Sequence, residues 1–526
     1  MVLSPAPRKI STIIACFIPT VYILLLWAYR LPQWETNDDV AMSMVAHGYG
    51  LAAFASPHLV FSNIVWGYFV SHIPSVAGVF GYSLATAGAL IIASSFIFYF
   101  MLRLGTGLFL SSLAIALIMC RPLLFPQFTL NAGLLAVAAI LGLLVNIRCG
   151  SRPCLWMAVA LGAIGFLIRS EEAIVVFGVA LPFLAGHRLE DGKTTSIALA
   201  LLVTVCVGAV LLDRWAYSGN EWQYFKELNA ARAPFTDYGA VAALLQKPEV
   251  LARHGYSEKD VRLVGNWLFV DEQIASPSRL KILLAELGPL QMGSFSWQSG
   301  INALTSLLHP VLAYLFCTAI ALAVLTPNLR VTIAWVFCLA GLFALGVAGR
   351  PSVFRVYIPI MSLLIVLPLT LIPAKAKLRR ALTAAVLAVA CFGNAKTVTS
   401  LAASFDQPIA RLKSTTPEKP VYVWGGSLPF EFIYSVLKTN EAFRHTVIYP
   451  LGTFSYAPFS ALYSKQLASQ GLIEDLKSEQ GALMIADANS YSLLDTYCRE
   501  HFGKRLNRTA VLDGGLFEIN RIDCGS

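Results

Sequence analysis

Long apolar runs separated by short polar gaps make up most of this chain. Many of the runs reach the roughly 20 residues that an α-helix needs to cross the hydrocarbon core of a bilayer. Eleven of them are predicted to span a membrane, with approximate bounds 11–29, 79–102, 106–125, 129–147, 154–170, 172–187, 194–214, 303–325, 331–349, 353–373 and 380–398. The pattern therefore predicts a polytopic α-helical membrane protein.

The basic residues in the gaps predict how these helices are oriented, because cytoplasmic loops carry an excess of Lys and Arg. With a cytoplasmic N-terminus, the inner gaps hold Arg8, Lys9, Arg103, Arg148, Arg152, Arg188, Lys193, Arg330, Lys375, Lys377, Arg379 and Arg380. The short outer gaps hold fewer: Arg30, Arg121, Arg169, Arg350 and Arg355. The charge bias therefore predicts an integral membrane protein with its N-terminus inside and its C-terminus outside. The membrane that we expect is a bacterial inner membrane, which would make the C-terminus periplasmic. The first helix of the protein is expected to be retained rather than removed as a signal peptide.

Two outer loops are large. The first covers residues 30–78 and contains the short apolar segment 59–76. A crossing there would reverse the charge bias of every later loop, so we expect a helix lying in the outer interface. The second outer loop covers residues 215–302 and has a helical pattern of apolar positions.

The polar C-terminal region, residues 400–526, is predicted to be a small extracytoplasmic α/β domain that follows the membrane module of residues 1–399. Its short apolar runs 421–424, 483–486 and 516–519 are typical of strands, and helical patterns lie between them.

Composition excludes a soluble globular protein and a nucleic-acid-binding protein. Hydrophobic residues make up 57% of the chain and charged residues 13%, against about 25% charged in average soluble proteins. The net charge of +9 is spread over the gaps rather than gathered in a basic, aromatic-rich cluster. Of the ten cysteines, Cys498 and Cys524 lie in the polar tail and could pair in an oxidising compartment, which the sequence does not decide.

Asp38 and Asp39 are the main candidates for chemistry. They directly follow the first apolar run, where a carboxylate pair would lie at the boundary between lipid and water. There they could act on a substrate whose tail stays in the bilayer. A structural role is also open, since acidic residues favour the first turn of a helix beginning near Thr36 or Asn37. Adjacent helical residues point about 100° apart, so the two carboxylates should do different jobs.

Two further charged clusters lie at predicted outer helix ends: residues 169–172 (Arg-Ser-Glu-Glu) and residues 349–357, with Arg350, Arg355 and Tyr357. Guanidinium groups bind phosphate oxygens as a bidentate fork, so an anionic ligand would explain arginines on the outer side. The alternatives are self-neutralisation of Arg169 by Glu172, contacts with lipid headgroups, or pairing with the acidic clusters.

Weaker candidates lie elsewhere in the outer loops. Trp222 and Arg232 could line a carbohydrate site, although such residues are more often structural, and His58 precedes the interfacial segment. The candidate sugar- or acceptor-binding residues are thus Asn37, His58, Glu171, Glu172, Trp222 and Arg232. No cysteine or histidine spacing indicates zinc.

This layout resembles the GT-C superfamily of integral-membrane glycosyltransferases. In architecture the resemblance covers most of the chain; in sequence it is carried by Asn37-Asp38-Asp39, with support from the clusters at 169–172 and 350–357. It implies an inverting enzyme that moves a sugar from a polyprenyl-phosphate carrier to a cell-envelope glycan or lipid. Asp38 or Asp39 would be the general base, and Arg169, Arg350 and Arg355, with Tyr357, would hold the leaving phosphate.

Other functions stay open at this point. A polymerase or ligase using a lipid-diphosphate-linked oligosaccharide would also use outer arginines but would not need the early aspartates. A transporter or a non-catalytic scaffold for envelope assembly is a different class, although no inverted repeat is found. The expected partners are the lipid-linked donor, the glycan or glycolipid acceptor and membrane lipids. No cofactor is predicted, and the need for a divalent metal is left open.

Overall fold

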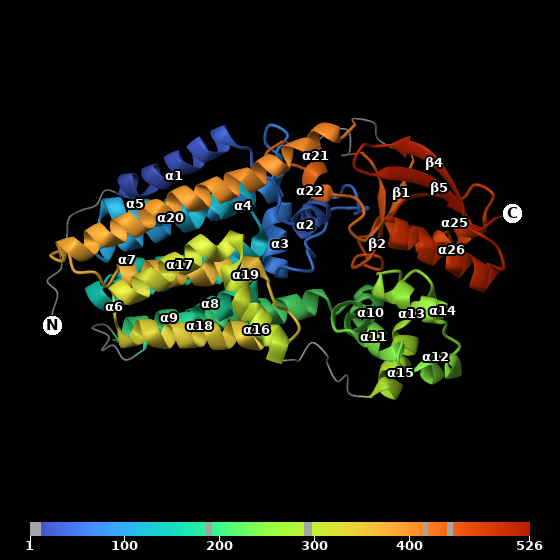
Figure 1. Cartoon of the computed structure of the whole chain (residues 1–526), viewed down its shortest axis with the longest axis horizontal. Coiled ribbons are helices and arrows are strands. Elements are labelled where there is room, and N and C mark those ends of the chain that lie inside the picture. Colours follow the sequence, from blue (N-terminus) through green and yellow to red (C-terminus); the bar gives the residue numbers. More distant parts are fainter. Residues whose placement is uncertain (1–11, 186–191, 289–296, 414–418, 439–444, 526) are drawn as a thin grey trace. The chain divides into compact units, whose positions relative to one another are not determined.

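The computed structural model describes residues 12–185, 192–288, 297–413, 419–438 and 445–525 (Figure 1). Arg8, Lys9 and Arg188, used above to predict orientation, lie outside the described residues. The chain forms two compact units. The helical unit consists of Met1–Asp39, His58–Asp213 and Trp297–Phe405, and the sheet unit of Val40–Pro57, Arg214–Ser296 and Asp406–Ser526.

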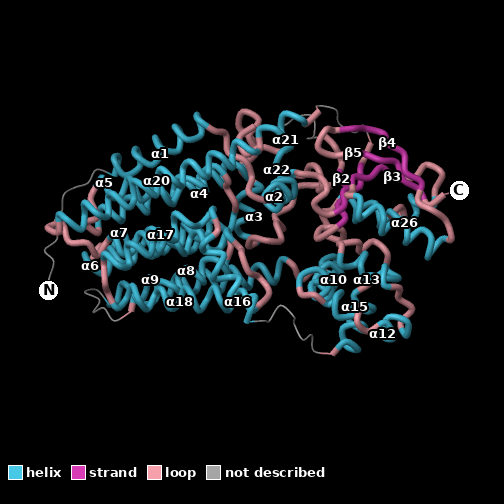
Figure 2. Tube along the Cα trace, in the orientation of Figure 1, coloured by secondary structure: helices cyan, strands magenta, loops and turns pink. Residues whose placement is uncertain are grey.

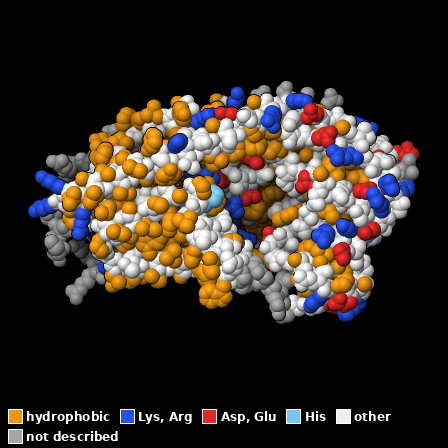
Figure 3. Space-filling view, in the orientation of Figure 1, with side chains coloured by type: hydrophobic (Ala, Val, Ile, Leu, Met, Phe, Trp, Pro, Cys, Tyr) orange, Lys and Arg blue, Asp and Glu red, His pale blue; other side chains and the backbone are white. Residues whose placement is uncertain are grey.

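The helical unit is built almost entirely from apolar helices. They are α1 (Thr12–Tyr29), α3 (Ile64–Ser71), α4 (Gly81–Arg103), α5 (Leu108–Leu124), α6 (Phe128–Cys149), α7 (Arg152–Ile168), α8 (Ser170–Leu184), α9 (Gly192–Ala216), α16 (Trp297–Thr305), η1 (Ser306–Leu308), α17 (Pro310–Leu325), α18 (Leu329–Val347), α19 (Phe354–Leu369) and α20 (Lys377–Ser404). Helix α6 is central: all of its residues from Phe128 to Asn146 are buried, and it packs against α4, α7, α8 and α19. Hydrophobic side chains cover the visible face of this unit (Figure 3).

Within the described ranges, five helices are long and apolar enough to cross a membrane. They are α4, α6, α9, α18 and α20, the last of which continues to Arg411. Four shorter apolar helices, α1, α5, α7 and α19, accompany them. The protein is therefore a multi-span helical membrane protein. The segment expected as one helix over 303–325 is instead a pair bent by 82° between Leu308 and Pro310. Proline fixes its own φ and favours the first turn of a new helix, which explains the break.

The first outer loop contains the two helices expected there, but the second of these helices is short. Helix α2 (Asn37–His47) begins at Asn37, as predicted. The apolar segment 59–76 forms only the eight-residue helix α3, whose N-cap Asn63 accepts a hydrogen bond from Val65 N–H. The chain around α3 is held in place because Asn63 Nδ2 donates to Ala209 O (3.0 Å) and Ile64 N–H donates to Asp213 Oδ1 (2.8 Å).

The sheet unit combines short helices with one sheet. Its helices, besides most of α2, are α10 (Asn220–Asp237), α11 (Ala240–Leu244), α12 (Pro248–Arg253), α13 (Glu258–Gly265), α14 (Glu272–Ala275), α15 (Pro277–Leu287), α21 (Asp406–Arg411), α22 (Phe430–Ile433), α24 (Ala461–Leu467), α25 (Leu472–Lys477) and α26 (Ala488–Phe502). Its strands are β1 (Val421–Trp424), β2 (Ile448–Leu451), β3 (Ala482–Ile485), β4 (Asn507–Asp513) and β5 (Glu518–Asp523) (Figure 2).

The strands form a mixed sheet in the order β2-β1-β3-β5-β4. β1 pairs in parallel with β2 and β3, whereas β5 runs antiparallel to β3 and β4. The expected strands at 421–424 and 483–486 are present within one residue, which confirms the predicted C-terminal α/β fold. The third expected strand, 516–519, begins two residues later and runs on to Asp523, and the sequence analysis did not predict β2 or β4.

The second outer loop and the C-terminal region share one hydrophobic core, although the sequence analysis placed them in different domains. Side-chain hydrogen bonds join them: Trp424 Nε1 donates to Asn266 O (2.6 Å), and Tyr456 OH donates to Phe269 O (3.0 Å). Apolar side chains of both segments are therefore buried together in this core.

Cys498 and Cys524, left open by the sequence, form a disulfide across 26 residues. It joins α26 to the end of β5. Both cysteines are buried in the core of the sheet unit. The bridge therefore restrains the C-terminal end of the sheet from within.

Candidate functional site

The acidic segment before α2 is fixed to the turn between α5 and α6. Gln33 N–H donates to Leu124 O (2.9 Å), and Glu35 N–H donates to Pro126 O (3.3 Å). The Glu35 carboxylate forms an ion pair with Arg121, with 2.6 Å between Oε1 and Nη2. Burial raises the pKa of Glu35, and Arg121 opposes that rise. This pair anchors the two aspartates that follow it.

Asp39 is fully buried and serves as a hydrogen-bond acceptor. Its Oδ1 accepts from Tyr82 OH (2.9 Å) and from Phe128 N–H (3.1 Å), at the first residue of α6. Its Oδ2 accepts from Thr36 Oγ1 at 3.4 Å. Burial, together with the neighbouring Asp38 charge, raises the pKa of Asp39 to about 8, although the hydrogen bonds from Tyr82 and Phe128 oppose the rise. A buried carboxyl with these partners is suited to fixing the Asp38–Asp39 segment to Tyr82 and to the first residue of α6.

Asp38 has a different environment, as the angle between adjacent helical residues predicted. Its side chain is 38% exposed, and its Oδ2 lies 3.3 Å from Arg355 Nη1. Arg355 is the second residue of α19, where the helix dipole is unfavourable for a cation. An anionic partner offsets that cost. Of the two aspartates, only Asp38 has a carboxylate that solvent reaches.

Arg169 lies between α7 and α8 and contacts three groups. Its Nη1 donates to Phe61 O (2.9 Å), its Nε lies 3.2 Å from Glu171 Oε2, and its guanidinium is 5.7 Å from the ring centroid of Phe128. The alternative pairing considered from the sequence, Arg169 with Glu172, is therefore replaced by a pair with the exposed Glu171.

Glu172 points into the helical unit. It is buried, and a Cβ at Gly133 would lie only 2.9 Å from its Oε1, so the carboxylate packs closely against α6. The charges of Arg169 and Arg355 both act on it. A buried carboxyl is costly unless cations or hydrogen bonds compensate it.

Electrostatic interactions link clusters that are far apart in the sequence. Arg355 interacts with Glu35, Asp39 and Glu172 as well as with Asp38. Arg350 is exposed in the turn between α18 and α19, and its positive charge, like that of Arg355, acts unfavourably on the charge of Arg169. All of these residues belong to the helical unit. We call this group, Glu35, Asp38, Asp39, Arg121, Arg169, Glu172, Arg350 and Arg355, the charge cluster.

Several buried polar atoms of the helical unit have no hydrogen-bond partner among the described residues. They include Glu35 Oε2, Asn37 Oδ1, Arg121 Nε, Gln127 Nε2, Asn131 Oδ1 and Glu172 Oε1. Such atoms are rare in protein interiors and mark places where water or a ligand binds. Three of these residues, Glu35, Arg121 and Glu172, belong to the charge cluster itself, and Asn37 directly precedes Asp38 in α2.

Comparison with known proteins adds no function to these residues. No protein-family model matches this chain, and no curated protein matches its sequence. What the chain can do must therefore be inferred from the charge cluster and from the fold around it.

Several predicted residues lie in structural positions. Tyr357 is buried, and its hydroxyl donates to Ala303 O (3.2 Å). Trp222 is 3% exposed in the core of the sheet unit, 5.3 Å from Phe225 between ring centroids. These contacts favour packing over ligand binding. His58 interacts electrostatically with Asp213, near the start of α3.

Arg232 is also held by its own neighbours. Its guanidinium stacks on Trp267 at 4.3 Å from the ring centroid, and its Nε donates to Asn229 Oδ1 (2.8 Å). Burial lowers the pKa of Arg232 to about 10, although Asp237 opposes the shift. These contacts give Arg232 a structural role within the sheet unit.

Sequence reasoning missed Glu35, Arg121 and Tyr82 as site residues. Arg121 carried a usable signal, because a cation within an apolar helix normally has a specific partner. Tyr82 and Gln127 carried none, since polar residues at helix starts are common.

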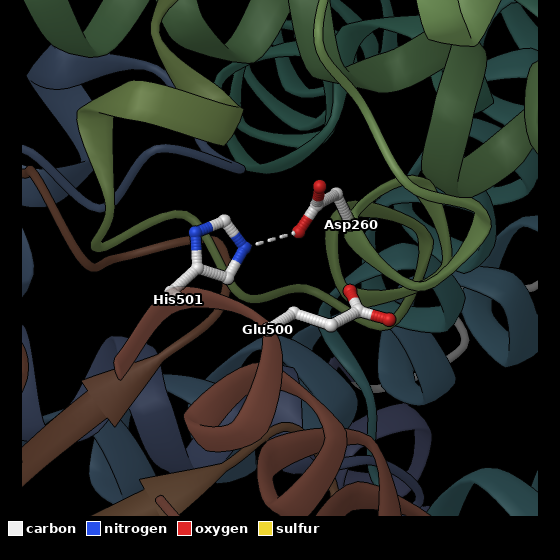
Figure 4. A group of neighbouring side chains, drawn as sticks. All are labelled: Asp260, Glu500 and His501. Carbon is white, nitrogen blue, oxygen red and sulfur yellow. Dashed lines mark hydrogen bonds and ion pairs between the residues drawn. The ribbon is translucent and has the colours of Figure 1, made fainter. Parts of the chain in front are cut away.

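One group of side chains in the sheet unit could hold a metal: Asp260, Glu500 and His501 (Figure 4). Their ligand atoms lie within 4.8 Å of one another. However, Asp260 Oδ1 is hydrogen-bonded to His501 Nε2 (2.8 Å), and Oδ2 accepts from Ser257 N–H (2.9 Å) in the capping box of α13. Since both oxygens are already used, we interpret the group as a contact between α13 and α26.

Proposed function

We propose that this protein is an inverting glycosyltransferase that moves a sugar from a polyprenyl-phosphate carrier to a cell-envelope glycan or lipid. The observation that carries the proposal is the ion pair of Asp38 with Arg355 in the charge cluster. A reachable carboxylate and a reachable guanidinium lie side by side at the ends of helices in a multi-span membrane protein. These are the groups that a base and a phosphate site require.

The proposed reaction uses Asp38 as the general base. Its carboxylate takes the proton of the acceptor hydroxyl while the acceptor oxygen bonds to the anomeric carbon. The bond between that carbon and the phosphate oxygen breaks, and the phosphate leaves with the electron pair. Arg355, Arg169 and Arg350 offset the charge that develops on the leaving phosphate. Asp39 positions Asp38 by fixing α2 to Tyr82 and Phe128.

The ion pair gives this mechanism an order of events. In the unliganded protein, Arg355 neutralises Asp38. A donor phosphate would compete for the guanidinium, because the bidentate phosphate contact is at least as favourable as the single contact to the carboxylate. Asp38 would then be released as a base only when the donor is bound.

The location of the reaction belongs to the same proposal. We propose that the eleven apolar segments cross the membrane with the N-terminus inside, so that the charge cluster and the sheet unit face the periplasm. The disulfide supports a non-cytoplasmic sheet unit, since such bonds persist in oxidising compartments.

The proposal is tested by donor specificity and product stereochemistry. Purified protein in nanodiscs would receive radiolabelled polyprenyl-phosphate sugars or polyprenyl-diphosphate oligosaccharides, with crude envelope acceptor. We expect transfer from a monophosphate donor, with the anomeric configuration of the product inverted when examined by NMR. Transfer from diphosphate-linked oligosaccharides alone would instead indicate a polymerase or ligase. Absence of transfer from both kinds of donor would contradict the proposal that this protein is a glycosyltransferase.

A further inference from the structure

The sheet unit contains a pocket of about 660 Å³ that lies entirely within its own residues. This volume falls in the range of about 300–1,000 Å³ typical of small-molecule sites. Three segments supply its walls: the chain after α2, the edge strand β2 with the residues before it, and α24. None of these residues takes part in the charge cluster.

The first wall is held rigidly. Ile448 N–H donates to Gly50 O (2.9 Å) and Ala461 N–H donates to Leu51 O (3.0 Å), so residues 50–51 run along the edge of the sheet. Gly48 and Gly50 both have positive φ, +67° and +61°, and a Cβ at Gly48 would lie 2.4 Å from Ala55 N. The two glycines therefore fix a tight turn that carries Tyr49 into the wall.

Tyr49, Tyr449 and Lys465 in the pocket lining are held by contacts within the protein. Tyr49 OH is hydrogen-bonded to Ser43 Oγ (3.1 Å). On the opposite side, the ammonium of Lys465 lies 5.0 Å from the ring centroid of Tyr449 and forms an ion pair with Asp475. Ser464 and Gln470 add an exposed hydroxyl and an exposed amide to the lining. Groups that are fixed before binding lose little entropy when a ligand arrives.

The lining excludes two ligand classes. Among the described residues that form it, there is no arginine, and the charge of Lys465 is offset by Asp475. A phosphate or another strong anion would therefore find little compensation, with His445 as the only other basic side chain in that lining. A purely apolar ligand would cover the exposed hydroxyl of Ser464 and the exposed amide of Gln470 without offering them a hydrogen bond, which is unfavourable.

A neutral sugar matches both kinds of surface. The C–H face of a pyranose packs on an aromatic ring, and its hydroxyls bond to amide, hydroxyl and ammonium groups. We propose that this pocket binds a short neutral glycan, with Tyr49 and Tyr449 as the aromatic contacts and Ser464, Lys465 and Gln470 as the polar ones. The identification of this glycan as the acceptor rests on the proposed function, whereas the binding of a glycan to the pocket is independent of it.

The test uses two exposed alanines of the same loop. Ala53 lines the pocket and Ala55 does not. Full-length wild-type protein in nanodiscs would be titrated by calorimetry and by saturation-transfer NMR with a panel of neutral gluco-, galacto- and manno-oligosaccharides, and with inorganic phosphate. We expect saturable binding of at least one neutral oligosaccharide, weakened at least about tenfold by Ala53→Trp and unchanged by Ala55→Trp.

Other outcomes are equally informative. Should Ala53→Trp fail to fold by its melting curve, Gln470→Ala is expected to weaken binding several-fold instead. Asp38→Asn should bind the glycan as wild type does, even where transfer is lost, so the failure of one proposal is distinguishable from the failure of the other. Absence of saturable binding to every neutral oligosaccharide, stronger binding of phosphate, or binding unaffected by the pocket variants would overturn the proposal.

Discussion

Asp38 and Arg355, 317 residues apart in the chain, form an ion pair in which 3.3 Å separates Oδ2 from Nη1. Both side chains are about one-third exposed, 38% and 35%. An exposed pair of this kind contributes little to stability, typically about 0–1 kcal/mol. Its interest is therefore functional: a carboxylate and a guanidinium that stabilise each other only weakly are easily separated by a ligand.

Removal of the guanidinium should reduce transfer far more than it reduces stability. We expect Arg355→Ala to lower kcat about a hundredfold, because a fixed cation opposite a developing phosphate charge contributes on that scale. The measurement is sugar transfer by protein in nanodiscs at saturating donor. Arg379→Ala, which removes an exposed arginine at the start of α20, serves as the matched control and should leave transfer unchanged. Equal losses in both variants would show that the effect is not local.

The buried carboxyl of Asp39 should make stability depend on pH. Its pKa is raised from 3.8 to about 8, so the folded state keeps a proton that the unfolded state loses. The stability that this group contributes is complete below about pH 4 and is lost as the pH rises to about 8. Asp39→Asn cannot lose such a proton, so we expect the melting temperature of wild type to fall relative to Asp39→Asn across that range.

The control for this effect is Asp38→Asn, which removes the neighbouring carboxylate that is about one-third exposed. It should leave most of the pH dependence of the melting temperature in place. If wild type and Asp39→Asn instead melt in parallel from about pH 5 to about pH 8, Asp39 does not hold a proton in the folded protein.

The pair of Glu35 and Arg121 should behave as a buried ion pair, since its side chains are only 15% and 9% exposed. We expect Glu35→Gln or Arg121→Met alone to cost about 3–5 kcal/mol, because each leaves one buried charge without its partner. The double variant should cost less than the sum. A double-mutant cycle on the free energy of unfolding in detergent measures the coupling between Glu35 and Arg121. Additive losses in the double variant would contradict a buried ion pair.

The disulfide should stabilise the sheet unit. Cys498 and Cys524 close a loop of 26 residues, for which loop-closure entropy predicts a contribution of about 3 kcal/mol. We expect the single variant Cys498→Ser and the double variant Cys498→Ser/Cys524→Ser to lower the melting temperature by similar amounts. A reductant should also lower the melting temperature of the wild-type protein. Cys317→Ser, at an exposed cysteine outside the disulfide, should have no such effect. Insensitivity of wild type to reductant would indicate that the bond does not form.

Much of the local structure could be predicted because it depends on neighbouring residues. The start of α2 at Asn37 and the strand at 421–424 followed from capping preference and from apolar runs. Strand β2 contains Pro450, which is unusual in a strand, and β4 is an exposed edge strand without an apolar face. Neither carries the signal on which strand prediction depends.

The charge cluster could be predicted only in part. The acidic pair and the outer arginines stood out, because charge at the end of an apolar run needs a reason. Which arginine would meet which aspartate could not be inferred, since the contact between Asp38 and Arg355 depends on how distant helices pack. The different burial of Asp38 and Asp39 likewise depends on Tyr82 and Phe128, whose positions follow from the tertiary fold.

The most direct test of the central claim is single-turnover sugar transfer by wild type, Asp38→Asn and Asp39→Asn in nanodiscs, with a polyprenyl-phosphate sugar and envelope acceptor. Melting curves would establish that each variant is folded. The account predicts that Asp38→Asn loses transfer by at least about a hundredfold, whereas Asp39→Asn keeps it within about tenfold. Transfer that survives Asp38→Asn, or that is lost only in Asp39→Asn, would contradict Asp38 as the base.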